Sequence, residues 1–253
     1  MLTNEKLDKK ILGFEQSEEE RIKEKLKEKA KKVREKAKKV REEEERIIKY
    51  KDPKDIYEFA RDVEDANIGR LEKAIIAIGD AKYIYKFAKN IKGAHIDKLE
   101  DAIIATYAAF YIYAFARDIN KGKDIYKLEN GIIATGDAEY IYNFAANIKG
   151  AHIDKLEDAI IAIGKDSIKD SNFDKEDAKK AYQAAEYMYN VAENIEGAHI
   201  DKLEDAIIAI CVSKIAMGAN EYAYKFAKNI KGAHIDKLED AIIATGDAEY
   251  IYD

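Results

Sequence analysis

The chain has 253 residues, of which 47% are hydrophobic and 37% are charged. This composition excludes a disordered chain and provides enough apolar residues for a packed core. The chain has one cysteine, so an intramolecular disulfide and a cysteine-based metal cluster are excluded. No apolar run approaches the ~18 residues of a membrane span, and no charged-then-apolar leader opens the chain. We expect an all-α, cytoplasmic protein that does not enter membranes.

Residues 1–51 form a charged N-terminal segment. Ser17 and Glu20 match a capping box, which predicts a helix from there to about Lys49. Residues 1–50 carry 17 basic and 13 acidic side chains, a net charge of +4, and the remaining residues carry 27 and 37, a net charge of −10. The apolar residues of the helix form a narrow stripe in which four lie seven positions apart: Leu26, Val33, Val40 and Ile47.

This stripe permits three interpretations of the N-terminal helix. The one we favour is that the helix covers the end of the following domain. Self-association as a coiled coil is the second, because a seven-residue apolar spacing is typical of coiled coils. Contact with nucleic acid or a membrane surface is the third and the least favoured, because glutamates are interspersed among the basic residues.

Residues 52–253 repeat themselves with a basic period of 28. The fourteen residues IKGAHIDKLEDAII start at Ile91, Ile148 and Ile230, and a fourth copy at Ile195 differs only at Glu196. Self-similarity at this spacing is typical of solenoids, in which each repeat packs mainly on its neighbours. The sequence predicts six repeats and a C-terminal half-repeat. The marker IYxFA and its variants start at Ile56, Ile84, Ile112, Ile141, Met188, Ala223 and Ile251.

Each repeat reads as two short helices. Gly79 is expected to end one helix, and Asp80 to cap the next, which runs to about Ile91. The group from Asp97 to Glu100 matches a capping box that opens a second helix reaching about Thr106. The predicted fold is a right-handed-type α-solenoid of stacked helical hairpins, preceded by the long charged helix.

The regular pattern is interrupted at three places. An insertion near 165–183 predicts a polar loop and then a first helix extended from an Asp174 cap. An insertion near 211–217 predicts a second helix that is longer by two turns. The junction from Ala105 to Ala116 lacks the usual glycine and aspartate, which predicts either a continuous helix or a poorly capped one. The last residues, 247–253, begin a seventh repeat, and we expect either a packed stub or a site of self-association.

No catalytic or metal-binding pattern stands out. His95, His152, His199 and His234 occupy one repeat position, but equivalent residues of stacked helices lie about 8–10 Å apart, too far to share one metal ion. We therefore expect linker histidines that contact backbone. Cys211 lies where helix packing favours a small apolar residue. We predict a non-enzymatic protein without metal or cofactor.

The feature most like a binding surface is aromatic. Thirteen of the 17 tyrosines fall in two columns, at equivalent positions of the first helices. The first column comprises Tyr83, Tyr111, Tyr140, Tyr187, Tyr222 and Tyr250. The second, our candidate binding ladder, comprises Tyr57, Tyr85, Tyr113, Tyr142, Tyr189 and Tyr224, followed by Tyr252. Packing between repeats is the alternative role, because solenoid helices bury both flanks.

The two-helix units, with the pattern DAEYIYKFAKNIKGAHIDKLEDAIIATG, resemble α-solenoids such as tetratricopeptide, HEAT and Pumilio-type repeats in architecture. Their near-identity also resembles recently amplified repeats of bacterial or phage proteins and idealised engineered arrays, and the irregular insertions favour a natural origin. The resemblance implies a scaffold or binding role.

Three functions follow as hypotheses. The leading one is an interaction scaffold that holds a protein or peptide along one face. The alternative is an acidic decoy or inhibitor, derived from a phage or mobile element, that blocks a basic nucleic-acid-binding protein through the repeated DKLED. An engineered repeat protein is the further alternative. Direct nucleic-acid binding is not expected, because the repeat region is acidic.

Overall fold

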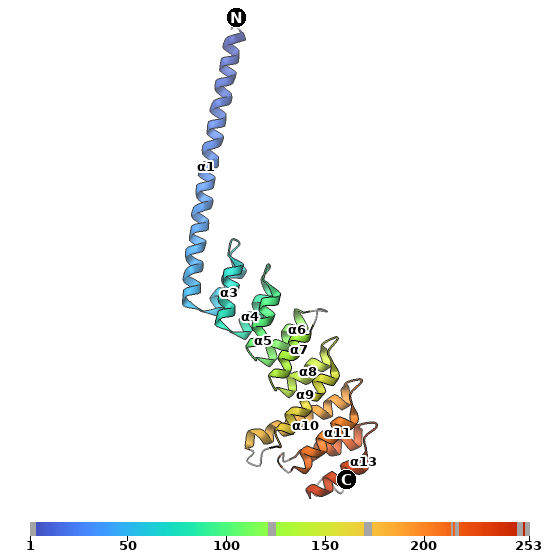
Figure 1. The fold of residues 1–253 in the computed structure, drawn as a ribbon. Helices are drawn as coiled ribbons and strands as arrows, with labels where there is room; N and C mark the ends of the chain where they lie inside the picture. Colours follow the sequence, from blue (N-terminus) through green and yellow to red (C-terminus); the bar gives the residue numbers. More distant parts are fainter. Residues whose placement is uncertain are drawn as a thin grey trace. The chain divides into compact units, whose positions relative to one another are not determined.

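The computed structural model describes residues 4–120, 125–169, 174–213, 215, 218–246 and 250, with side chains from Glu18 onward. Within these ranges the chain forms thirteen helices and no strand, so the predicted all-α class is confirmed (Figure 1). None of the helices described is both long enough and apolar enough to cross a bilayer. The helices are α1 (Asn4–Tyr50), α2 (Pro53–Asp62), α3 (Ile68–Ile78), α4 (Ala81–Asn90), α5 (Ile96–Ala105), α6 (Ala109–Asp118), α7 (Tyr126–Ala134), α8 (Ala138–Asn147), α9 (Ile153–Asp166), α10 (Lys175–Asn194), α11 (Ile200–Val212), α12 (Asn220–Asn229) and α13 (Ile235–Thr245).

The chain divides into two compact units. The first comprises residues 1–78 and 90–94, and in it α1, α2 and α3 pack on one another. The second comprises residues 79–89 and 95–253. From α5 to α13 each helix of this unit packs on the next helix and on the next but one.

The core contains one apolar position of the first helix and one of the second helix of each repeat. The first helices bury the residue that opens the IYxFA marker, which is fully inaccessible in α2, α4, α6, α8, α10 and α12. The second helices bury the leucine of DKLED, which is equally inaccessible from α3 to α13. Because these residues recur at the same place in every repeat, the period of 28 is the period of the core. The leucines are Leu71, Leu99, Leu128, Leu156, Leu203 and Leu238.

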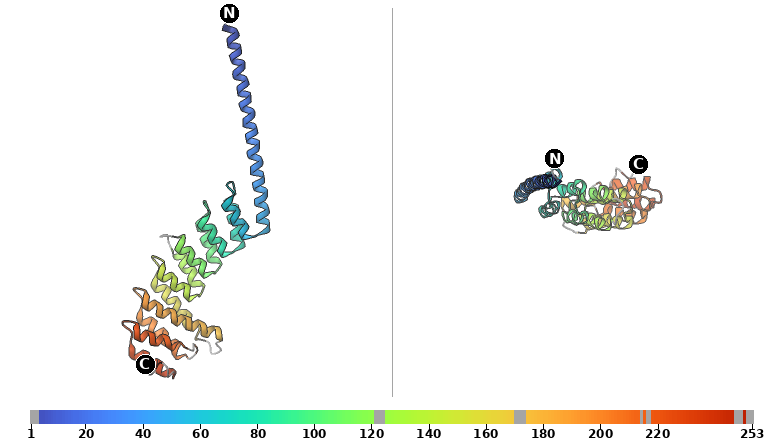
Figure 2. Two further views of the ribbon diagram at one scale, coloured as in Figure 1. Left: turned by 180° about the vertical axis from the view of Figure 1, so that it is seen from behind. Right: turned by 90° about the horizontal axis from the view of Figure 1, so that it is seen from above.

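The long N-terminal helix does not begin where the sequence indicates. The capping box at Ser17 predicts a start there, whereas α1 begins at Asn4 and runs through Ser17 as one uninterrupted rod (Figure 2). Residues 4–16 contain no proline and are rich in lysine, glutamate and leucine. Their helix propensity is enough to continue the helix, so the potential cap is not used.

The last turns of α1 resemble the second helix of a repeat in their buried residues and in how the helix ends. Glu44 and Ile47 are buried, and they lie 28 residues before Glu72 and Ile75 of α3. Lys51 ends α1 with a positive φ of 56°, as Gly79 ends α3 with a φ of 75°. The backbone N–H of Asn67 donates to Glu44 across 3.1 Å. The pattern of the repeat therefore begins inside α1, before the sequence boundary at residue 52.

The aspartate caps of the first helices are confirmed. Asp52 accepts from the backbone N–H of Lys54 at 2.8 Å, and Asp80 and Asp137 cap in the same way. Asp174 caps the start of α10, as predicted, and Asp177 completes a capping box with it.

The capping box predicted for the second helices is wrong. Helix α5 begins at Ile96, its N-cap residue is His95, and no side chain of its own caps it. The glutamate assigned to the box is buried instead: Glu129, Glu157 and Glu204 are at most 1% exposed. A group this deeply buried requires hydrogen bonds to compensate for its lost hydration.

These buried glutamates cap the second helix of the following repeat. Glu129 accepts the backbone N–H of His152 at 2.9 Å, Glu157 that of His199 at 2.9 Å, and Glu204 that of His234 at 2.6 Å. Each N–H belongs to an N-cap residue, so the free donors at a helix start are satisfied from the neighbouring repeat.

The charged residues of DKLED also connect successive repeats. Lys127 pairs with Asp101 at 2.9 Å, Lys202 with Asp158 at 3.2 Å, and Lys237 with Asp205 at 3.6 Å. In each pair the lysine belongs to the later repeat. The repeated sequence thus contains a core residue, a cap for the next repeat and both halves of an ion pair.

At the two insertions, near 165–183 and near 211–217, helices α9 and α11 end at other residues than the sequence predicts. Helix α9 continues through Gly164 to Asp166, and a Cβ at Gly164 would lie 2.8 Å from Met188 and from Ile210. The glycine therefore permits close helix packing. Helix α11 ends at Val212, so it lengthens by less than the predicted two turns. Ser213 ends it by donating to the carbonyl of Ile210 and accepting from the N–H of Ile215.

The junction between α5 and α6 is a break, so of the two predicted alternatives the continuous helix is wrong and the poorly capped helix is confirmed. Tyr107 takes the place of the repeat glycine with a positive φ of 54°. Ala108 takes the place of the aspartate and provides no side-chain cap. The left-handed region costs a residue with a Cβ about 1–2 kcal/mol. Of residues 247–253, where the C-terminal half-repeat was predicted, only Tyr250 lies within the described residues.

Replacing Tyr107 by glycine is expected to stabilise the protein by about 1 kcal/mol, because glycine adopts the left-handed conformation without steric cost. The denaturant midpoint measures the change. Gly136→Ala is the matched control, because Gly136 has a φ of 67° at the equivalent position and a Cβ there would meet no atom within 4 Å. It should lower the midpoint, and a Tyr107→Gly midpoint equal to or below that of the wild type would contradict the prediction.

Replacing Glu157 by alanine is expected to lower the free energy of unfolding by about 1–3 kcal/mol, because the helix start at His199 loses its acceptor. Glu239→Ala is the control, because Glu239 occupies the same repeat position but is exposed. Its effect should stay within about 0.5 kcal/mol. Equal losses in the two variants, measured by urea unfolding, would show that the capping contact does not stabilise the fold.

Candidate protein-binding face

The second-column tyrosines lie along the first helices and are only partly accessible. Tyr57 and Tyr189 are buried, at 7% and 8% exposure, and the others are half-buried: Tyr85, Tyr113, Tyr142 and Tyr224. All six residues of the predicted ladder are therefore buried or half-buried.

The two tyrosine columns meet between repeats. Five second-column rings lie against the first-column ring of the next repeat. The distances between ring centroids are 6.0 Å for Tyr85 and Tyr111, 6.2 Å for Tyr113 and Tyr140, 5.7 Å for Tyr142 and Tyr187, 6.3 Å for Tyr189 and Tyr222, and 5.8 Å for Tyr224 and Tyr250. Tilted pairs at these separations are favourable, so the columns contribute to packing between repeats.

The tyrosine hydroxyls bond to the end of the next first helix. The side-chain amide of Asn90 donates to Tyr57 at 3.1 Å, and that of Asn229 donates to Tyr189 at 3.0 Å. These contacts fix the rotation of each ring. Tyr224, near the C-terminal end of the described chain, instead lines a hollow of about 460 Å³ together with Lys228, Ile235 and Tyr250.

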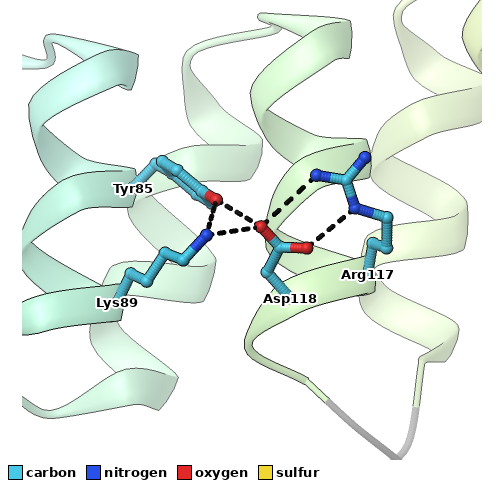
Figure 3. A network of polar contacts seen from close by, with 4 residues as sticks. All are labelled: Tyr85, Lys89, Arg117 and Asp118. Atoms are coloured by element: carbon cyan, nitrogen blue, oxygen red, sulfur yellow. Dashed lines mark hydrogen bonds and ion pairs between the residues drawn. The ribbon is translucent and has the colours of Figure 1, made fainter.

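A four-residue network surrounds the hydroxyl of Tyr85 (Figure 3). Tyr85 donates to Asp118, Lys89 contacts both oxygens of this pair at 2.7 Å, and the Nε of Arg117 donates to Asp118 at 2.7 Å. The guanidinium of Arg117, followed by Lys89 and Tyr85, holds the pKa of Asp118 well below its usual range, although burial acts in the opposite direction. Asp118 is thus a charged anchor between α4 and α6.

Sequence reasoning missed this network and a row of cations associated with it. A basic residue follows four of the second-column tyrosines by four positions and lies over the ring. The distances to the ring centroids are 5.5 Å for Arg61, 5.2 Å for Lys89, 5.3 Å for Arg117 and 5.2 Å for Lys228. The spacing of four is visible in the sequence, and because such residues are neighbours on a helix it was a usable signal.

At the junction between α5 and α6 an exposed aromatic residue replaces a charged one. Phe110 stands where α4 has Lys82 and α8 has Glu139, and it is 48% exposed. Its ring lies 4.9 Å from that of Tyr111 and 6.0 Å from that of Tyr140. Nearby in sequence, Tyr107 is 66% exposed.

We call this group the aromatic cluster. Ring contacts in it join the exposed Phe110 to the half-buried columns over α4, α6 and α8. The rings in contact are those of Tyr85, Phe110, Tyr111, Tyr113 and Tyr140. We include the exposed Tyr107 because it lies three residues before Phe110 in the chain.

The histidines contact a carboxylate instead of the expected backbone. The Nδ1 atom of His152 lies 2.9 Å from Glu129, and that of His234 lies 3.1 Å from Glu204. Each histidine therefore binds the same glutamate by its ring and its backbone N–H. Within the described residues no group of three or more candidate ligands is placed to hold a metal ion.

Cys211 packs as a small apolar residue, as expected. It is 2% exposed, and its thiol donates to the carbonyl of Ala219 at 3.4 Å. Burial raises the pKa of the thiol to about 12. A thiol with this pKa remains protonated at neutral pH and is a poor nucleophile.

Comparisons with protein-family models, with curated proteins and with solved structures found no match for this chain.

The Asp118 network predicts a pH-dependent contribution to stability. Because the pKa of Asp118 is lowered in the folded state, its contribution should be complete above the unfolded-state pKa of about 4 and decline as the pH falls below it. The stability difference between wild type and Asp118→Asn, from unfolding at pH 7 and pH 3, should therefore be larger at pH 7.

Asp62 supplies the control for this measurement. It occupies the equivalent position of α2, and its side chain is 57% exposed beside Arg61. Solvent screening makes such a pair weak, so Asp62→Asn should change stability little at either pH. A constant Asp118→Asn difference across the pH range would contradict the assignment.

Proposed function

We propose that this protein is a non-enzymatic interaction module that binds a protein or peptide partner over the aromatic cluster. In this proposal the helical pairs stack as a right-handed α-solenoid and act as a rigid support. The single observation that carries the proposal is the exposed pair Tyr107 and Phe110, which replaces the repeat's own glycine and charged residue.

The departures at this junction are costly for folding and do not improve the local structure. Tyr107 has a backbone conformation suited to glycine, and Ala108 forgoes a cap that Asp80 and Asp137 supply elsewhere. Residues that break a local rule without a structural gain are expected where function requires them. An exposed aromatic group is a favourable anchor for a partner, because it buries a large area with little loss of side-chain entropy.

The second-column tyrosines of the aromatic cluster support this proposal because their side chains are already held in place. Tyr85 and Tyr113 are held by neighbouring rings and by Lys89, Arg117 and Asp118. A surface whose side chains are already ordered loses little entropy on binding. Their packing role and a binding role are compatible, because half-buried rings retain an accessible edge.

The acidic-decoy hypothesis has less support. It rests on the repeated DKLED, but three of the four glutamates of this motif, Glu100, Glu157 and Glu204, are buried, and Glu239 is exposed. The second aspartate is paired with a lysine of the next repeat in three cases, Asp101, Asp158 and Asp205. What remains accessible to a basic partner is chiefly the first aspartate, such as Asp154 and Asp201.

The proposal is tested by restoring the repeat pattern. The double variant Tyr107→Gly, Phe110→Lys introduces at the junction and in the first turn of α6 the residue types of Gly79 and Lys82, so the fold should be retained. Peptides selected from a random displayed library on the wild-type protein should bind the double variant at least tenfold more weakly, a loss of about 1.4 kcal/mol. Fluorescence anisotropy with labelled peptides measures the affinities.

Lys82→Glu is the matched control. It exchanges the two residue types that occupy the Phe110 position in α4 and α8, and it should leave peptide affinity unchanged. Selected peptides that bind the wild type and the double variant equally would overturn the assigned surface. A library that yields no binder to the wild type would also count against a peptide-binding role.

A further inference from the structure

The N-terminal helix carries an apolar seam that is only partly covered. From Leu26 onward the seam residues are spaced alternately by four and three positions: Leu26, Ala30, Val33, Ala37, Val40, Glu44 and Ile47. An average spacing of 3.5 is the heptad repeat of a coiled coil.

The C-terminal end of the seam is already an interface. Glu44 and Ile47 are buried, Val40 is half-buried, and α1 packs here on α2 and α3 of the same compact unit. Further towards the N-terminus the same stripe is open, with Leu26 at 61% and Val33 at 60% exposure. The open part therefore continues a packing surface that the fold itself uses.

Basic residues line both sides of the open seam. Lys27, Arg34 and Arg41 follow one edge, and Lys29 and Lys36 follow the other. Residues 23–41 contain eleven basic and three acidic side chains, a net charge of +8. The positions beside an a/d seam select the partner of a coiled coil by their charge.

Three glutamates at a seven-residue spacing lie on the side opposite the seam. Glu28, Glu35 and Glu42 are seven residues apart, and two of them pair with lysines of that side: Glu28 with Lys32 at 2.8 Å and Glu42 with Lys38 at 3.6 Å. The acidic residues therefore offset the positive charge away from the seam and leave its two edges basic.

The fold contains one example of the pairing that such an edge favours. Lys36, on the edge of the seam, contacts the carboxylate of Asp65 at 2.9 Å from the connection between α2 and α3. The hydrogen bond to Asp65 raises the pKa of Lys36. A carboxylate beside the apolar seam is thus compatible with the geometry of this helix.

A second copy of α1 is a poor occupant of the seam. In a parallel pair Lys29 would face Arg34 and Lys36 would face Arg41 of the other copy, and in an antiparallel pair each edge would face itself. Both arrangements place like charges beside the seam, which disfavours association. The seam is also narrow and built of alanine, valine and leucine without aromatic residues, unlike helices that insert into membrane interfaces.

We propose that residues 22–41 of α1 bind an acidic amphipathic helix of another protein as a two-stranded coiled coil. The partner helix presents a heptad apolar seam to Leu26, Ala30, Val33 and Ala37, and it carries glutamate or aspartate at the positions that flank the seam. This site is separate from the aromatic cluster, so it does not depend on the proposed peptide binding there.

The test uses the full-length protein and two synthetic 21-residue peptides as probes. Both have alanine at a and leucine at d in three heptads, with glutamate at e and g in one peptide and lysine in the other. The glutamate peptide should bind at least tenfold more tightly at physiological salt, where weak surface attraction is screened. Fluorescence anisotropy of the labelled peptides gives the affinities.

A pair of matched variants separates a coiled coil from general charge attraction. Leu26→Ala with Val33→Ala removes seam side chains, retains all charges and retains helix propensity, and it should weaken binding of the glutamate peptide at least tenfold. Lys25→Ala with Lys32→Ala removes two positive charges away from the seam and should change the affinity by no more than about threefold. Equal weakening by the two double variants would overturn the proposal.

Two further measurements address other occupants. Sedimentation of the protein alone should show no self-association that the seam variant abolishes, and such self-association would assign the seam to a second copy. Vesicles containing phosphatidylserine, or a short DNA duplex, should bind more weakly than the glutamate peptide and without sensitivity to the seam variant. Tighter, seam-dependent binding of either probe would replace the acidic helix as the occupant.

Discussion

The hydrogen bond from a helix start to a buried glutamate of the preceding repeat is the constraint on which this structure depends. A buried carboxylate is unfavourable unless several donors satisfy it, and here the donors are a backbone N–H, a histidine ring and a basic side chain of the next repeat. The same arrangement recurs at Glu44, where Asn67 and Arg70 take the places of the histidine and the lysine. Each repeat thus completes the one before it.

This constraint explains why the fourteen-residue sequence is repeated almost without change. A leucine fills the core, a glutamate caps the next repeat, and a lysine and an aspartate pair with the neighbours on either side. Changing one position in one repeat disturbs a contact in another. The capping contact recurs at Glu44, Glu129, Glu157 and Glu204, whereas Glu239 at the same position near the C-terminal end is exposed.

The two binding surfaces that we propose lie where the chain departs from the repeat pattern. The junction at Tyr107, Ala108 and Phe110 gives up a glycine, a cap and a charge, and it gains exposed aromatic area beside the tyrosine columns. Helix α1 departs in another way. Its last turns supply the contacts of a second helix to α2 and α3, and its earlier turns extend the same seam with basic edges. Both departures add a surface without disturbing the core.

The sequence by itself determined the helical class, the period of 28, the core positions and the aspartate caps of the first helices. These features follow from local rules: helical spacing of apolar residues, glycine stops and short polar side chains at helix starts. The thirteen tyrosines in two columns are also visible in the sequence. A helical wheel does not show what covers each face, so it does not decide between a packing role and a binding role.

Only the tertiary structure decided the partners of the repeated charges. Asp97 to Glu100 satisfies the local rule for a capping box, yet Glu100 is 9% exposed and its counterparts Glu129, Glu157 and Glu204 cap the next repeat. Contacts across 23 to 42 residues depend on how the helices pack, and insertions change that separation without changing the contact. Likewise Ser17 matches the pattern for a helix start, but α1 begins at Asn4 and continues through Ser17. Local sequence offers such alternatives, and the free energy of packing between repeats selects among them.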